Sequence, residues 1–238
     1  KGHKYIMKVK LISHSQVQDL VGSPKDDLKN DSSLLGLVAY CARVSNPSNQ
    51  NNTATNSKLV NYLVKHKHWS PLEMVSVCLE IETTRDIARQ LLRHRSFSFQ
   101  EFSQRYANPL EDLEMVTREA RFQDPKNRQN SVAIDTTDAN QRRIAEDWNM
   151  KQMAFIRQSK DLYQWAIDSG IAKEQARAVL PEGNTVSRLY VNGTLRSWIH
   201  YIELRSGNGT QLEHMEVARR VGEVITNVFP LAENYIQE

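Results

Sequence analysis

The stretch EMVSVCLEIETTRDIARQLLRHR (Glu73–Arg95) contains two different hydrophobic periods in direct succession. Its first half alternates apolar and polar residues, which predicts a β-strand over 73–83 with one buried face. The alternating apolar residues are Val75, Val77, Leu79 and Ile81. Its second half has the period of a helix running to about His94, with Thr83 or Thr84 as a cap and Asp86 favoured in the first turn.

The rest of the chain alternates in the same way between strand and helix patterns. Further strands are predicted over 5–13 and 184–191, the latter followed by a turn at Asn192-Gly193. Helices are predicted over 31–43, 58–65, 137–169, 174–180, 194–205 and 212–228, whereas 46–56 is expected to be a loop and 107–136 has no clear period. Because no repeat or linker divides the chain, we expect one α+β domain over residues 1–238.

Composition excludes several classes of protein. The chain has 238 residues, 39% hydrophobic and 25% charged, and no run near the roughly 18 apolar residues of a membrane span. Its two cysteines, Cys41 and Cys78, cannot form a disulfide framework or a four-cysteine zinc site, and we expect both to be buried and inert. We therefore expect a cytoplasmic protein with no membrane partner and no metal.

Positive charge is concentrated in one window. Residues 84–106 contain five arginines against Asp86 and Glu101, a surplus equal to the net charge of +3 of the whole chain. Such a focus suits an anionic ligand, and Arg with Ser is a good combination for phosphate. No GxGxxG or GxxxxGK[ST] motif is present, so we expect neither a Rossmann nor a P-loop cradle. A solvated basic helix end and a nucleic-acid-binding module stay open as alternatives.

A second basic group follows later in the chain, at Arg177, Arg196, His200 and Arg205. On a helix Arg196 and His200 share a face, while Arg205 lies about 180° around from Arg196. Two pockets, or one helix between subunits, would explain this placement, and one arginine facing solvent is the plainer alternative.

The long helix over 137–169 has an apolar side, formed by Met150, Met153, Ala154, Leu162, Trp165 and Ala166. We interpret this side as core or subunit interface, and a helical assembly protein built on this helix is a third possible function.

The motif RHRSFSFQEFSQRY (Arg93–Tyr106) resembles the signature of the flavin-dependent thymidylate synthases. CARVS (41–45), HWSPLE (68–73), EQARAVLP (174–181) and LRSWIHYIELR (195–205) resemble further blocks of that family, in its order. The resemblance implies a mixed β-sheet flanked by helices, without a Rossmann unit, in a homotetramer with active sites where subunits meet. It also implies methylation of dUMP to dTMP with 5,10-methylenetetrahydrofolate, using FAD reduced by NADPH.

The same resemblance implies the residues of the site. The dUMP set is Gln90, Arg93, Glu101, Ser103, Gln104, Arg105, Arg177 and Arg205. The FAD set is Ser45, Ser70, Arg93, His94, Arg95, Glu101, Thr194, Arg196 and His200. Arg205 resembles the family's arginine that stabilises charge on the uracil, with no cysteine nucleophile. Thr194 and Gly209 depart from the family's usual residues.

Overall fold

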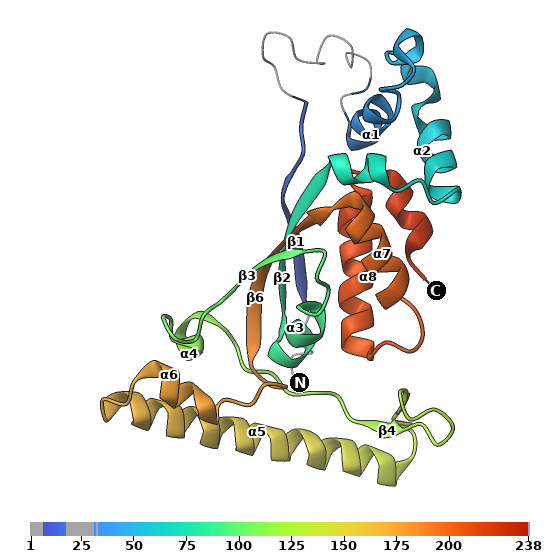
Figure 1. The fold of residues 1–238 in the computed structure, drawn as a ribbon. Coiled ribbons are helices and arrows are strands. Elements are labelled where there is room, and N and C mark those ends of the chain that lie inside the picture. The colour runs from blue at the N-terminus through green and yellow to red at the C-terminus, as the bar shows by residue number, and fades with distance from the viewer. Residues whose placement is uncertain (1–6, 18–30, 32, 238) are drawn as a thin grey trace.

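A four-stranded sheet forms the middle of the molecule (Figure 1). The computed structural model describes residues 7–17, 31 and 33–237. The sheet order is β1-β2-β6-β3, with β1 at Lys8–His14, β2 at Ser76–Thr84, β3 at Ser98–Glu101 and β6 at Val186–Thr194. The predicted strands over 5–13, 73–83 and 184–191 are confirmed as β1, β2 and β6, although Tyr5 and Ile6 lie outside the described residues.

Two expectations about the sheet are wrong. All three pairings within the described four-stranded sheet are antiparallel, so this sheet is not mixed in strand direction. Asn192-Gly193 is not a turn, because β6 continues through it and pairs with Cys78 and Val77 of β2. Glycine is needed there for packing: a Cβ atom on Gly193 would lie 2.2 Å from Cδ1 of Phe97.

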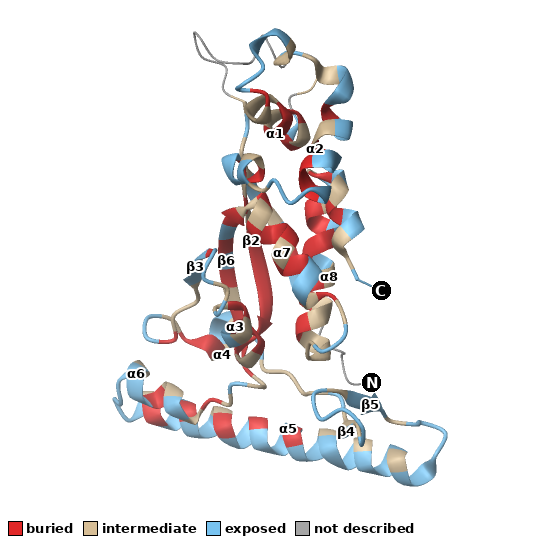
Figure 2. Ribbon diagram, turned by 45° about the vertical axis from the view of Figure 1, so that its right-hand side comes forward, coloured by how far each residue is buried: buried red, intermediate tan, exposed pale blue. Residues whose placement is uncertain are grey.

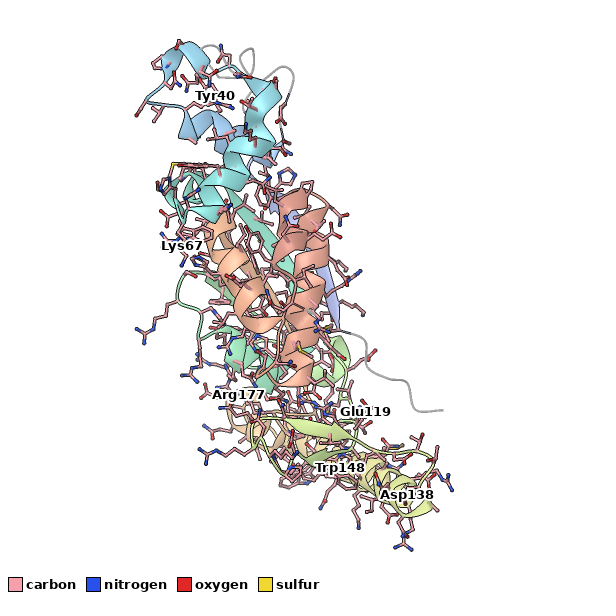
Figure 3. The ribbon with its side chains drawn as sticks, turned by 90° about the vertical axis from the view of Figure 1, so that its right-hand side faces the viewer. Tyr40, Lys67, Glu119, Asp138, Trp148 and Arg177 are labelled. Carbon is pink, nitrogen blue, oxygen red and sulfur yellow. The ribbon has the colours of Figure 1, made fainter. Side chains whose placement is uncertain are left out.

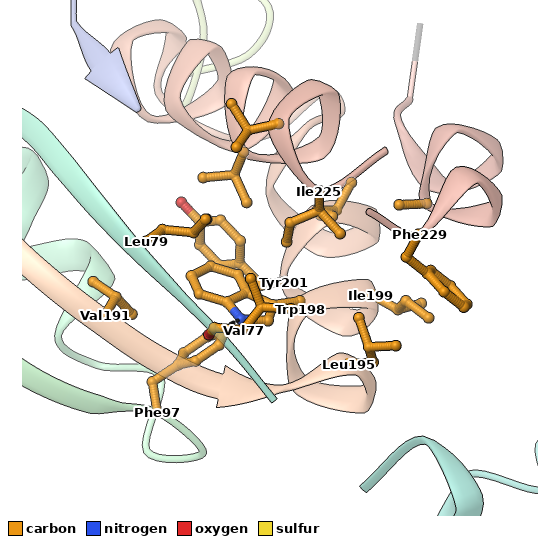
Figure 4. Close-up of a cluster of buried hydrophobic side chains, with 14 of the residues drawn as sticks. Val77, Leu79, Phe97, Val191, Leu195, Trp198, Ile199, Tyr201, Ile225 and Phe229 are labelled. Carbon is orange, nitrogen blue, oxygen red and sulfur yellow. Dashed lines mark hydrogen bonds between the residues drawn. The ribbon is translucent and has the colours of Figure 1, made fainter. Parts of the chain in front are cut away.

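The inner face of the sheet packs against α7 (Leu195–Arg205) and α8 (Leu212–Thr226), and this contact forms the main core (Figure 4). Alternation along β2 directs every second residue toward these helices. Trp198 of α7 is fully buried in the core, and its indole N–H donates to the carbonyl of Val77 at 2.9 Å. The residues labelled in Figure 4 are Val77, Leu79, Phe97, Val191, Leu195, Trp198, Ile199, Tyr201, Ile225 and Phe229.

The outer face of the sheet carries a ladder of charged and polar side chains. Glu82 of β2 lies between Lys8 at 3.5 Å and Arg188 at 3.4 Å. Glu80 lies between Lys10 at 3.2 Å and the hydroxyl of Tyr190, which donates to it at 2.9 Å. Opposite charges on neighbouring strands stabilise the pairing, each by a few tenths of a kcal/mol to about 1 kcal/mol.

The remaining elements lie at the two ends of the sheet. Figure 1 shows α1 and α2 beyond one end, and α5 with α4, α6 and the two-stranded β4–β5 sheet at the other. Their bounds are α1 Leu34–Ala42, α2 Asn56–Lys65, α3 Arg85–Leu91, α4 Pro109–Asp112, α5 Ala139–Asp168, α6 Lys173–Ala176, β4 Arg121–Gln123 and β5 Ser131–Ala133. The hairpin and α4 occupy 107–136, where the sequence had no clear period, because elements of three or four residues are too short to show one.

Helix α5 crosses the base of the molecule as a single long rod, buried only on the side facing the sheet (Figure 2). Asp138 caps it by accepting from the N–H groups of Asn140 and Gln141, and Gly170 follows it at a φ of 81°. Both ends match the predicted helix over 137–169.

The packing at Gly193 predicts a destabilising substitution. Gly193→Ala places a methyl group in the ring of the buried Phe97, and such overpacking costs about 1–3 kcal/mol. Urea unfolding should therefore show a lower free energy of unfolding. Gly183→Ala is the control, since the nearest atom to its new Cβ lies 3.9 Å away. Equal stability of the two variants would contradict the packing described for β6.

Candidate active site

The ends of two helices converge beside the sheet. Helix α3 follows β2 directly and α7 follows β6 directly, and because the two strands are antiparallel the helices start at opposite ends of the sheet. Their C-terminal ends therefore meet, and Nε of Arg205 donates to Nε2 of His94 at 3.1 Å across 111 residues of sequence. This contact joins the two basic groups found in the sequence.

The His94 ring is neutral in this arrangement. It is half-buried, and it lies edge-on to the Tyr201 ring with 5.1 Å between centroids. Burial, together with the charge of Arg205, lowers the pKa of His94 below its ordinary value. Since Nε2 accepts the arginine N–H, the ring proton resides on Nδ1.

A chain of hydrogen bonds continues from Tyr201 into the protein. Fully buried His214 lies within 3.1 Å of the Tyr201 hydroxyl through Nε2 and of Gln90 Oε1 through Nδ1. Gln90 donates to Gln211 at 2.8 Å, and Gln211 donates to Glu213 at 2.9 Å. Burial, with the nearby charges of Arg205 and His94, lowers the pKa of His214 to about 3.

This series of hydrogen bonds ends at Glu213, which belongs to a cluster of ion pairs. Glu213 accepts from Arg121 at 2.6 Å and lies 3.5 Å from Arg118, which also contacts Asp86 at 2.6 Å. Burial on its own would raise the pKa of Glu213, but the hydrogen bonds from Arg121 and Gln211 and the charge of Arg118 hold it below its usual range. Glu213, in the first turn of α8, is therefore an ionised acceptor held by Arg121 of β4.

The predicted dUMP residues fall into three groups. Gln90 belongs to the hydrogen-bonded network around His214, and Arg205 donates to His94, whose ring lies against Tyr201 of that network. Arg105 and Arg177 both contact Glu174, Arg105 through an ion pair at 3.6 Å and Arg177 through a hydrogen bond to the carbonyl at 3.4 Å. Figure 3 shows Arg177 near helix α5, at the base of the molecule.

Glu101 forms the third group and is engaged within the chain. Its carboxylate lies 3.4 Å from Arg85 and 3.5 Å from Arg89, and it accepts from the hydroxyl of Ser187 at 2.8 Å. Neighbouring Ser103 contacts only the backbone N–H of Arg105 among the described side-chain contacts, at 3.4 Å.

The predicted FAD residues are also spread over the molecule. Arg196 pairs with Glu73 at 2.7 Å, His200 packs edge-on against Trp69, and Thr194 caps α7 by accepting from the N–H of Ser197. Ser45 and Ser70 are exposed near the α1 end of the molecule, and no described contact joins them to the other predicted residues.

Several polar groups have no partner in the described part of the chain, as expected where a ligand binds. Arg93 and Arg95 are exposed, and neither guanidinium has an ion pair with a described residue. Gln104 is 4% exposed, yet its Nε2 has no hydrogen-bond partner among the described atoms. A buried, unpaired donor is costly, so Gln104 and the free arginines fit an oxygen-rich phosphate ligand.

Several residues of the site were not identified from the sequence. His214, Tyr201 and Gln211 hold the centre of the network, and Asp86, Arg118, Arg121 and Glu213 close its end. One signal was available for His214, since Val217, Ala218 and Val221 follow it at the spacing of one buried helix face. A histidine on that face needs polar partners inside the protein.

The arginine window leaves less free charge than its sequence suggests. Arg85 and Arg89 both pair with Glu182 and Glu101, and Arg105 pairs with Glu174. These contacts argue against a broad basic face for nucleic acid.

Other candidate chemistries have little structural basis. Across 7–17, 31 and 33–237, no cluster of His, Cys, Asp and Glu could hold a metal ion. Cys41 and Cys78 are half-buried rather than buried, and desolvation raises the pKa of both thiols, which disfavours the nucleophilic thiolate. Among the described helices, none is both long and apolar enough to cross a membrane.

Comparisons with known proteins agree on one family. Residues 30–231 match the family model described as thymidylate synthase complementing protein. A probable flavin-dependent thymidylate synthase of Paramecium bursaria Chlorella virus 1 is 50% identical over 198 residues, covering 82% of this chain and 86% of that protein. A flavin-dependent thymidylate synthase of Synechocystis is 49% identical over 195 residues, with coverages of 82% and 86%.

The fold has a solved counterpart. The crystal structure of a UMP/dUMP methylase, PolB from Streptomyces cacaoi, bound with 5-Br dUMP, matches this chain with a TM-score of 0.75 and 25% sequence identity. The match covers 98% of this chain and 95% of that one.

Burial of neutral His214 predicts how stability depends on pH. The pKa of His214 is about 3 in the folded chain, against 6.5 for an ordinary histidine such as that of the unfolded chain. At a pH between these two pKa values, unfolding is therefore accompanied by the uptake of a proton. The free energy of unfolding therefore falls as the pH drops below 6.5, by about 1.4 kcal/mol per pH unit for this one group.

The measurement is urea unfolding between about pH 6 and pH 5 for wild type and His214→Asn. The variant lacks the titrating group, so its stability should fall less steeply with pH. Identical slopes for the two proteins would contradict a neutral, buried His214.

Proposed function

The chain belongs to the flavin-dependent thymidylate synthases, and we propose that it methylates dUMP to dTMP with 5,10-methylenetetrahydrofolate, using FAD reduced by NADPH. The observation that supports this function best is the convergence of His94 and Arg205, from two distant family motifs, beside the network that holds Gln90. When bound, FAD supplies the redox chemistry that no side chain can provide.

Arg205 is well placed to stabilise charge that develops on a uracil ring. Its Nε is fixed by His94, while Nη1 and Nη2 have no partner among the described residues. A guanidinium stays protonated in any such site, so Arg205 acts as a fixed positive charge and not as an acid. His94 holds the guanidinium in place because its neutral Nε2 is an acceptor.

The free arginines and Gln104 are the proposed contacts of the nucleotide and the cofactor. Arg105 and Arg177 lie together at Glu174 and are proposed to bind dUMP with Ser103 and Gln104. Arg93 is proposed to serve both ligands, and Arg95, His94 and Arg196 to hold FAD with the hydroxyls of Ser45, Ser70 and Thr194 and the ring of His200. Glu101 is proposed to act mainly through the arginines it holds.

A homotetramer, with active sites at the subunit interfaces, is proposed from the surface of α5. Apolar side chains are exposed along this helix: Ile144, Trp148, Met150, Met153, Phe155, Leu162 and Trp165. Four of them, Ile144, Trp148, Phe155 and Leu162, fall within about 40° of one another on the helix. An apolar stripe of this length is typical of a protein–protein interface.

The proposed interface can be tested by light scattering. We expect wild type at the mass of four chains, and the double variant Trp148→Glu, Phe155→Glu at a smaller mass with lost activity, because buried charge opposes association. The matched control Trp148→Phe, Phe155→Leu keeps an apolar surface and should stay tetrameric. A monomeric wild type would refute the assembly.

The role of Arg205 can be tested by turnover. Arg205→Ala should retain the yellow colour of bound FAD but lose about 10²–10³-fold in kcat for dUMP methylation, since it removes a charge that stabilises the transition state. Arg220→Ala is the control, because its ion pair with Glu223 is exposed on α8. Unchanged turnover in Arg205→Ala would remove the catalytic assignment, and a wild type that never binds FAD would refute the proposed function.

A further inference from the structure

His214 forms a hydrogen bond of fixed direction with Gln90, which is proposed to bind the substrate. The ring is 0% exposed, between α3 and α7, and both of its nitrogens have partners. Gln90 lies on one side and Tyr201 on the other. A buried histidine with both nitrogens engaged has one tautomer set by its neighbours.

Glu213, at the far end of this series of hydrogen bonds, determines the tautomer of His214. The carboxylate of Glu213 can only accept, so Gln211 must direct its N–H toward Glu213 and its oxygen toward Gln90. Gln90 then donates to Gln211 through Nε2 and presents Oε1 to His214. His214 consequently donates from Nδ1 and accepts the Tyr201 hydroxyl proton at Nε2.

We propose that His214 is a positioning residue for the nucleotide, because its Nδ1–H group, together with Gln211, holds the Gln90 amide in one orientation. The proposal rests on the proposed function, in which Gln90 binds dUMP. With one lone pair of Oε1 taken by His214 and one N–H taken by Gln211, the second N–H of Gln90 stays free. Gln90 therefore presents a donor at a fixed position, suited to an oxygen of the nucleotide. An unrestrained amide would present its oxygen there as readily.

Two substitutions of His214 distinguish the role of Nδ1 from that of Nε2. The amide of Asn in His214→Asn can place an N–H where Nδ1 was, and so keeps the donor to Gln90 while it loses the Tyr201 contact. The amide of Gln in His214→Gln reaches the position of Nε2, so it keeps the Tyr201 contact and loses the donor. Both variants disturb the core, and only the second removes the contact to Oε1 of Gln90, which leaves Gln211 as the single described restraint on that amide.

The experiment compares dUMP affinity, KM and kcat in the FAD-loaded variants. His214→Asn should keep the Kd for dUMP within about twofold of wild type, while His214→Gln and His214→Leu should raise Kd and KM about tenfold with little change in kcat. The melting temperature and FAD content of each variant are measured alongside. If dUMP affinity follows the melting temperature, or if Asn and Gln variants weaken binding equally, the inference is wrong.

Measurements on the unaltered protein keep the inference testable if the variants fold poorly. Nitrogen NMR of histidine-labelled wild type should show His214 as the Nδ1–H tautomer with and without dUMP. The Nε2–H tautomer would overturn the positioning role. Failure of wild type to bind dUMP at all would instead overturn the proposed function, which separates the two conclusions.

Discussion

The full antiparallel register of β2 and β6 is the constraint on which the site depends. Each strand is nine residues long, and they pair from Ser76 opposite Thr194 to Thr84 opposite Val186. Each continues into a helix without a loop, so α3 and α7 start from opposite ends of the pair and point toward each other. A slip of one residue would turn the core face of β2 outward and would also separate His94 from Arg205.

The polar network can be buried in this core because each side chain in its series of hydrogen bonds has a partner. The hydrogen bonds run from Tyr201 through His214, Gln90 and Gln211 to the carboxylate of Glu213. Arg121 and Arg118 neutralise that carboxylate and connect it to β4 and to Asp86 at the start of α3. A single connected set of bonds therefore joins Gln90 to the elements at the base of the sheet, where an unpaired group would be costly.

Some of the groups left unsatisfied within the described chain lie where ligands and subunits are proposed. The arginines Arg93 and Arg95 and the amide of Gln104 have no partner there, and α5 exposes an apolar stripe. Folded proteins seldom leave buried polar groups or large apolar patches without a partner. The main core is formed by the chain's own residues, whereas the proposed binding surfaces need a ligand or a second subunit.

The sequence by itself determined the local elements and the family. Alternation in 73–83 predicted β2, a change of period predicted α3, and Asp138 and Gly170 lie at the ends of the long helix that its pattern predicted. These features depend on neighbours within a few residues, which a sequence displays directly. The motif RHRSFSFQEFSQRY likewise identified the family before any contact was known.

Tertiary structure alone decided how those elements combine. The antiparallel direction of the sheet, the continuation of β6 through Gly193, and the meeting of His94 with Arg205 all join residues far apart in the chain. His214 resembles any other residue of an amphipathic helix until Tyr201 and Gln90 are placed beside it. Its protonation state and its role depend on burial and on the direction of hydrogen bonds, which are properties of three-dimensional packing and not of local sequence.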